Sequence, residues 1–142
     1  MKDTATVAYK FVEAIPKKLE EMTVYVSIEY ATAVHKCCCG CGQEVATPFA
    51  PNDWKLTYDG VSVSLWPSIG NWSFDCQSHY WITNNAVKWA GRWSPEQITA
   101  GRNADRNAKA VQFTMLKVPP NKTGNAKRES LWSRLWNLVT FD

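Results

Sequence analysis

The cysteines and histidines of this sequence gather in two short segments, and this grouping restricts the folds that the chain can adopt. The chain has five cysteines and two histidines. Four of the cysteines lie between His35 and Gly42, and the fifth, Cys76, precedes His79 by three residues. Thiolate and imidazole are the ligands that zinc prefers, and a tetrahedral site commonly joins one turn to a distant segment. The fold is therefore expected to bring the two segments together around a metal ion.

The spacing within the first segment allows more than one ligand set. Cys38 and Cys41 form a C-x-x-C knuckle, whereas Cys37, Cys39 and Cys41 share one face if the backbone is extended. A loop this small cannot aim four successive thiols at one ion, so we expect two or three of them to bind. The two glycines of the segment favour a turn.

Other roles for the cysteines fit the sequence less well. Adjacent cysteines bridge poorly and their number is odd, which argues against disulfides. Buried structural thiols would explain one or two cysteines, but not four beside two glycines. Iron–sulfur motifs usually space their cysteines further apart. We predict that the cofactor is zinc.

Length and charge limit the class of protein. A chain of 142 residues is expected to form a single domain with a real core. Residues 1–87 carry a net charge of −3 and residues 88–142 carry +6. Because no nucleic-acid motif accompanies the basic part, we do not expect nucleic acid as a partner. No apolar run approaches the roughly 20 residues that span a bilayer, so we expect a soluble, cytoplasmic protein without membrane contact.

Most of the chain is predicted to be β-structure. A hairpin is expected around Asp59-Gly60, with Pro67 ending its second arm and a loop over residues 68–72, and a second tight turn is expected at Asn84-Asn85. The predicted strands cover residues 7–15, 23–27, 44–47, 54–58, 61–65, 79–82 and 86–89.

The last third of the chain is predicted to be helical. Ser94, Pro95 and Gln97 form a capping box that starts a helix ending near residue 112. Residues 119–124 are expected to be a linker, and residues 131–139 place apolar side chains on one helical stripe that packs on the sheet or anchors a partner. The predicted fold class is α+β: one domain with a compact β-rich sheet and zinc-binding cysteine loop over residues 1–92, and a basic helical part over residues 93–142.

Two kinds of zinc site fit the two segments. A three-ligand zinc would activate water for attack on a carbonyl, with His79, His35 or Glu44 handling protons. Ser78 could alternatively act as a nucleophile, but it would need His35, because Ser78 and His79 point to opposite faces of a strand. A closed four-ligand zinc would only join the loop to the sheet.

Four motifs together resemble a known family. They are His35-x-Cys-x-Cys-Gly-Cys-Gly, Asp53-Trp-Lys-Leu-Thr, Pro67-Ser-Ile-Gly-Asn-Trp and Cys76-x-Ser-His-Tyr-Trp-Ile. In this order they resemble the bacterial family catalogued as domain of unknown function 6527, over roughly residues 8 to 90. Members of that family occur beside genes for ubiquitin-like proteins and their activating and conjugating enzymes, in systems associated with phage defence. The resemblance implies that the chain processes or removes a ubiquitin-like modifier.

The resemblance also narrows the candidate residues. It favours Cys37, Cys39, Cys41 and Cys76 as the ligand pool, and it singles out the polar residues Asn71, Ser78 and His79. We therefore predict a zinc-dependent peptidase-like or isopeptidase-like hydrolase, with a ubiquitin-like protein, and its activating or conjugating enzymes, as partners. The alternative is a zinc module that docks these partners without catalysis. The predicted residues are His35, Cys37, Cys39, Cys41 and Cys76 for the metal, His79, Ser78 and Glu44 for catalysis, and Asn71 and Trp72 for the substrate.

Overall fold

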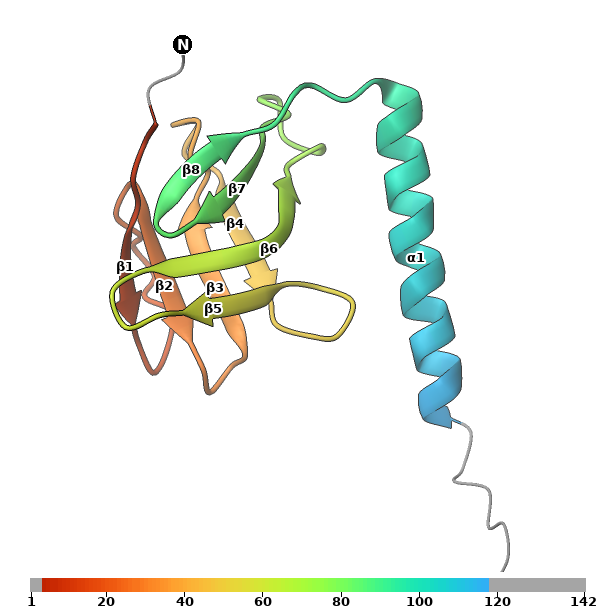
Figure 1. Cartoon of the computed structure of the whole chain (residues 1–142), viewed down its shortest axis with the longest axis horizontal. Coiled ribbons are helices and arrows are strands. Elements are labelled where there is room, and N and C mark those ends of the chain that lie inside the picture. The colour runs from red at the N-terminus through yellow and green to blue at the C-terminus, as the bar shows by residue number, and fades with distance from the viewer. Residues whose placement is uncertain (1–3, 118–142) are drawn as a thin grey trace, which may run out of the picture. The chain divides into compact units, whose positions relative to one another are not determined.

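Two four-stranded sheets make up most of the computed structural model, which describes residues 4–117 (Figure 1). The first sheet has the spatial order β1 (Ala8–Phe11), β2 (Thr23–Ser27), β3 (Thr32–Lys36), β4 (Glu44–Pro48). The second has the order β5 (Lys55–Tyr58), β6 (Val63–Gly70), β7 (His79–Thr83), β8 (Ala86–Trp89). One helix, α1 (Pro95–Lys117), follows them. The predicted α+β class is confirmed, with the β-structure divided between two sheets.

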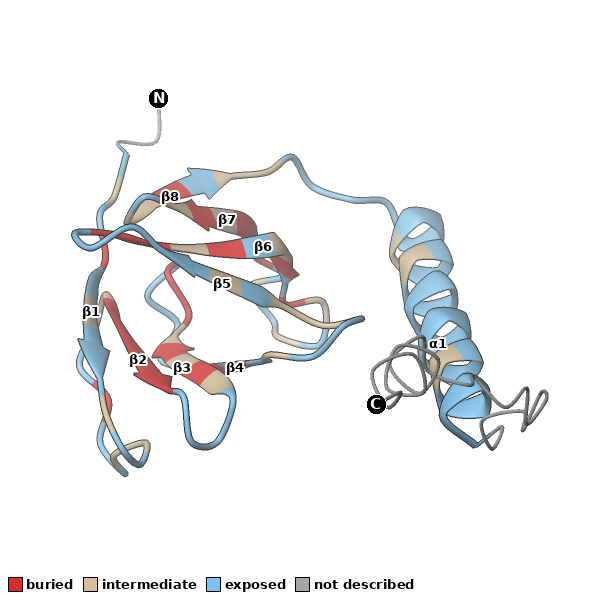
Figure 2. Ribbon diagram, turned by 60° about the horizontal axis from the view of Figure 1, so that its bottom comes forward, coloured by how far each residue is buried: buried red, intermediate tan, exposed pale blue. Residues whose placement is uncertain are grey.

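The hydrophobic core is shared by the two sheets (Figure 2). Every residue of β2 is buried, which fits its run of β-branched and aromatic side chains. From the second sheet, Leu65, Ile69, Tyr80 and Ile82 are each 2 % exposed or less. The apolar faces of the sheets thus stabilise each other.

The second sheet is an antiparallel meander whose turns follow from local sequence. The turn between β7 and β8 places Asn84 and Asn85 at φ angles of 48° and 64°. Asparagine tolerates this left-handed region better than most residues, so the predicted tight turn is confirmed. The Asn85 side chain also accepts a hydrogen bond from the Val63 backbone N–H at 2.8 Å, which ties the turn to β6.

The first hairpin of this sheet differs from the prediction in two respects. Tyr58 pairs with Val63, so the connection has four residues rather than the two of Asp59-Gly60. The Asp59 carboxylate explains the longer loop, since it accepts hydrogen bonds from the backbone N–H groups of Val61 and Ser62. Pro67 does not end the second arm, because β6 continues to Gly70. Pro67 lies where the β6–β7 register shifts, and there its missing N–H breaks no regular ladder.

Helix α1 begins where the capping box predicts. Gln97 N–H donates to the Ser94 hydroxyl at 3.2 Å, and Ser94 N–H donates to the Gln97 side-chain oxygen at 2.8 Å. The helix extends to Lys117 rather than residue 112, and none of its residues is buried. The chain divides into one unit through Lys109 and a second from Ala110. No helix among residues 4–117 combines the length and apolar character that crossing a membrane requires.

Two predictions on the C-terminal part lie outside the described residues. They are the linker over residues 119–124 and the apolar helix over residues 131–139. The predicted strand over residues 7–15 is reduced to β1. Strand β3 was not predicted from the sequence, and it occupies the segment that leads into the cysteine loop.

Candidate functional site

Four thiols from two sheets meet in one cluster, which we call the thiol cluster. Cys37, Cys39 and Cys41 lie on the loop between β3 and β4 of the first sheet, and Cys76 lies on the loop between β6 and β7 of the second. All four sulfur atoms lie within 4.8 Å of one another. The two sequence segments are therefore brought together as predicted, and the cluster connects the sheets.

The thiol cluster fits a tetrahedral metal ion. Zinc–sulfur bonds of about 2.3 Å place the sulfurs of a regular tetrahedron about 3.8 Å apart. In the cluster, Cys37 Sγ lies 3.4 Å from Cys39 Sγ and 3.9 Å from Cys76 Sγ. Gly40 and Gly42 take φ angles of 88° and 81°, which lets the loop curl around the sulfurs. Four thiolates would fill all four positions of a zinc ion, as in closed structural sites.

Cys38 and His35 have other surroundings. Cys38 is buried in the hydrophobic core, and burial raises its pKa to about 11. His35 is 1 % exposed and its Nε2 lies 2.8 Å from the Tyr80 hydroxyl. Burial lowers the pKa of His35 to about 4, so the ring is neutral at pH 7. The structure thus brings together four of the five residues predicted to bind the metal. The fifth, His35, is outside this group and contacts Tyr80 instead.

Ser78 and Asn71 lie beside the sulfur of Cys37. The Ser78 hydroxyl is 2.9 Å from Cys37 Sγ, and the Asn71 side-chain amide donates to Ser78 Oγ at 2.9 Å and to Cys37 Sγ at 3.6 Å. Both residues are buried. Burial alone would raise the pKa of the Cys76 thiol. Hydrogen bonds, of which the one with Ser78 has the largest effect, outweigh burial and lower this pKa to about 7. Hydrogen bonds of this kind orient the thiols, as such bonds do for the ligands of a metal ion.

His79 faces a different serine. Its Nε2 lies 2.9 Å from the hydroxyl of Ser68, within hydrogen-bond distance. Ser68 is on β6, and His79 begins β7, where it pairs with Gly70. The two side chains thus come from neighbouring antiparallel strands, which hold them in fixed register.

Tryptophan side chains surround the His79 imidazole. The ring centroids of Trp72, Trp81 and Trp93 lie 4.8, 5.6 and 5.0 Å from that of His79, and Trp72 stacks on Trp93 at 5.2 Å. Gly70 makes room for this arrangement, because a Cβ there would lie 2.5 Å from the Trp72 ring. Ser68, His79 and Trp72 line a cleft of about 340 Å³, hereafter the reaction cleft.

The environment of His79 sets its protonation state. Burial lowers the pKa of His79 from its ordinary value of 6.5, and the Gly91 backbone opposes this in part. The buried Nδ1 makes no hydrogen bond of normal geometry in the described part of the chain. The imidazole is therefore neutral at pH 7, and its Nε2 is able to accept the Ser68 proton.

Glu44 and Trp72 complete the predicted set. Glu44 is exposed at the start of β4, pairs in register with Lys36, and is absent from the lining of the reaction cleft. Trp72 lies in the reaction cleft against His79.

A family model matches residues 11–90, more than half of the chain. It describes the bacterial ubiquitination-like system serine protease BubE. The chain belongs to the BubE family. The expected link to a bacterial ubiquitination-like system is confirmed, although the model does not carry the name domain of unknown function 6527. No curated protein and no solved structure gives a significant match.

The BubE match covers both the thiol cluster and the Ser68–His79 pair. Sequence reasoning selected His79 but did not select Ser68 as a candidate. The signal was present in the motif Pro67-Ser-Ile-Gly-Asn-Trp, which contains Ser68. This signal is hidden because Pro67 predicts the end of the strand, which leaves Ser68 on a loop with no fixed relation to His79.

Proposed function

We propose that this chain is a serine hydrolase of a bacterial ubiquitination-like system, with Ser68 as nucleophile and His79 as general base. The observation that carries the proposal is the 2.9 Å contact between Ser68 Oγ and His79 Nε2 in a cleft. The description of the BubE family as serine proteases supports it. Ser78, the serine selected from the sequence, is 7 % exposed and faces Cys37, which leaves less room for a substrate carbonyl.

The proposed reaction is acyl transfer through Ser68. His79 Nε2 takes the hydroxyl proton while Ser68 Oγ bonds to the carbonyl carbon of the scissile amide. The resulting tetrahedral intermediate expels the amine, which receives the proton from His79. Water then hydrolyses the Ser68 ester by the same steps, releasing a carboxylate and restoring the serine. The lowered pKa of His79 keeps it in the form that begins this cycle.

In this proposal the metal has a structural role. The thiol cluster would hold zinc through Cys37, Cys39, Cys41 and Cys76, with no coordination position left for water. Zinc would then supply a fixed link between the β3–β4 and β6–β7 loops. This differs from the zinc-activated water expected from the sequence, because the proton acceptor and nucleophile are both side chains of the second sheet.

The proposed substrate is a ubiquitin-like protein with an extended C-terminal tail. Cleavage after the tail would either process a precursor or release a conjugated target, since both reactions break an amide on the same acyl group. Activating and conjugating enzymes of the system are further proposed partners, and action in the cytoplasm in phage defence is the proposed setting. Membership of the BubE family supports the choice of a ubiquitin-like partner.

The second candidate is a binding module without catalysis. The closed set of four thiols and the buried Nδ1 of His79 favour it, because a catalytic histidine usually donates this proton to an acceptor. Under this alternative the reaction cleft would hold the tail without cleaving it.

The test is cleavage of the system's ubiquitin-like protein carrying a C-terminal peptide extension. We expect Ser68→Ala and His79→Ala each to lower kcat by about a thousandfold or more, as loss of a nucleophile or base does. Ser78→Ala is the matched control and is expected to keep cleavage if it stays folded. Cleavage that survives in Ser68→Ala would contradict the proposal, and cleavage absent from the wild type would favour the binding module.

A further inference from the structure

A second, apolar groove lies beside the reaction cleft. It has a volume of about 550 Å³ and is lined mainly by hydrophobic side chains, among them Ile28, Phe49, Leu56 and Trp66. Ile28 and Trp66 are 66 % and 69 % exposed. Apolar side chains so exposed around a groove mark a binding surface more often than isolated ones do.

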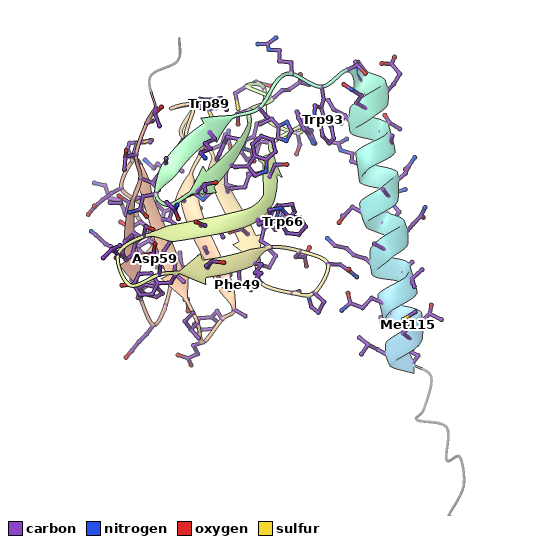
Figure 3. All side chains as sticks on the ribbon, viewed as in Figure 1. Phe49, Asp59, Trp66, Trp89, Trp93 and Met115 are labelled. Carbon is purple, nitrogen blue, oxygen red and sulfur yellow. The ribbon has the colours of Figure 1, made fainter. Side chains whose placement is uncertain are left out.

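The apolar groove continues into the reaction cleft. Asp53 and Trp54 line both. The segment Trp66-Pro67-Ser68 also joins them, since Trp66 lines the groove while Pro67 and Ser68 line the cleft. Figure 3 shows Trp66 standing out from β6 above the loop that joins β4 and β5. A chain bound at Ser68 can therefore extend into the groove without leaving the surface.

We propose that the apolar groove is a specificity subsite that takes one apolar side chain from the tail of the ubiquitin-like substrate. The inference rests on the proposed function. One residue separates Trp66 from Ser68, and Trp66 lines the groove while Ser68 lines the reaction cleft. The side chain that fills the groove therefore belongs to one of the last few tail residues before the scissile bond.

The chemistry of the reaction places this side chain on the acyl side. Precursor processing and deconjugation share the same tail, whereas the amine that leaves is a peptide in one case and a lysine side chain in the other. Only a subsite for the acyl segment serves both reactions. An apolar anchor in this position separates the correct tail from other extended chains, because a polar side chain would lose its water without gaining hydrogen bonds.

The test is a double-mutant cycle between the tail and Trp66. The probe is the system's ubiquitin-like protein with a peptide extension, and each apolar residue among the last four tail positions is changed in turn to Ala. In wild-type enzyme, one of these changes is expected to raise KM about tenfold with little change in kcat. In Trp66→Ala, the same change is expected to have almost no further effect, because the two side chains share one contact.

Two enzyme variants serve as controls. Val61→Ala truncates a side chain that is 77 % exposed and absent from the lining of either cavity, so it is expected to retain the full tail dependence. Trp66→Phe retains an aromatic wall and is expected to restore most of the wild-type KM. The inference would be overturned if the change in the tail and Trp66→Ala each raise KM independently, so that their effects multiply without coupling.

Binding to Ser68→Ala separates this inference from the proposed function. This variant is expected to bind the tail without cleaving it. The double-mutant cycle between the tail and Trp66 is therefore repeated in the Ser68→Ala background, with Kd measured by calorimetry. Coupling in Kd without cleavage by the wild type would sustain the groove as a tail site and reject the hydrolase. Cleavage without coupling in either KM or Kd would reject the subsite and leave the hydrolase intact.

Discussion

At the scale of single residues, the proposed chemistry depends on how His79 is enclosed. Its imidazole is 5 % exposed and has tryptophan rings around it. Burial in these apolar surroundings disfavours the charged imidazolium. The side chain therefore remains a base at neutral pH, and its Nε2 lies 2.9 Å from the Ser68 hydroxyl.

The pH dependence of cleavage follows from this enclosure. Because neutral His79 is the active form, kcat/KM is expected to fall as pH drops through the pKa of the free enzyme. Burial lowers that pKa, so the midpoint of the acid limb should lie below 6.5. Trp93→Ala opens one side of the ring and is expected to move the midpoint up towards 6.5. A midpoint above 7 in the wild type would contradict this assignment.

The buried pair of His35 and Tyr80 is expected to contribute to stability rather than catalysis. Tyr80→Phe removes the hydroxyl that contacts His35 Nε2 at 2.8 Å and leaves a buried ring nitrogen without this partner. The free energy of unfolding should fall by about 1–3 kcal/mol. Urea denaturation measures it, with Tyr30→Phe as control, since Tyr30 is 64 % exposed. Equal stability of both variants would contradict the expected role of the contact.

At the scale of structural elements, the glycines of the β3–β4 loop let it curl so that its three thiols join the thiol cluster. Gly42 has a φ of 81° and open space around it, so Gly42→Ala introduces backbone strain and no clash. Such strain costs roughly 1–2 kcal/mol, which would lower zinc affinity about tenfold. Gly91→Ala is the matched control, because Gly91 also faces open space but has no positive φ. Competition with a chromogenic chelator measures both, and equal affinities would contradict the expected effect.

The sequence predicted those elements whose signals are local. The β7–β8 turn and the start of α1 were predicted correctly. Asn84 and Asn85 tolerate the positive φ angles of a tight turn, and Ser94 and Gln97 satisfy each other's backbone N–H groups. The path of β6 beyond Pro67 could not be predicted in this way, since a shift in pairing with β7 accommodates the proline. The division into two sheets is likewise set by packing between distant strands.

The same distinction holds for the candidate site. Cysteine spacing was sufficient to predict the thiol cluster, but it left open which thiols belong to it. The structure excludes Cys38 from the four grouped sulfurs, because this side chain turns into the core. The pairing of Ser68 with His79 depends on strand register, which the sequence around Pro67 obscured.

At the scale of the whole molecule, the thiol cluster joins the two sheets. Three of its sulfurs come from the first sheet and one from the second, while Ser68 and His79 both belong to the second. A metal ion here would restrict the β6–β7 loop, whose end carries His79. In the proposed function, such a metal would influence cleavage through the position of this loop rather than through bound water.

Metal exchange is expected to distinguish a metal that positions the β6–β7 loop from a metal that activates water. Cadmium also binds four thiolates, so the cadmium-substituted protein should keep most of the cleavage rate and a similar Tm. Complete metal removal should lower both Tm and cleavage, since the link between the sheets is lost. Cys76→Ser is expected to lose the metal, and Cys38→Ser is the control that retains it. A cadmium form that is fully folded but inactive would contradict a structural role.

Labelling with a fluorophosphonate, which reacts with activated serines, tests whether Ser68 is the nucleophile of the proposed reaction. Intact mass and peptide mapping after reaction are expected to show one label, on Ser68, which is lost in His79→Ala and retained in Ser78→Ala. Labelling of Ser78 would contradict the assignment of Ser68 as nucleophile. Cleavage of the ubiquitin-like substrate by Ser68→Ala, or by protein already labelled on Ser68, would also contradict it.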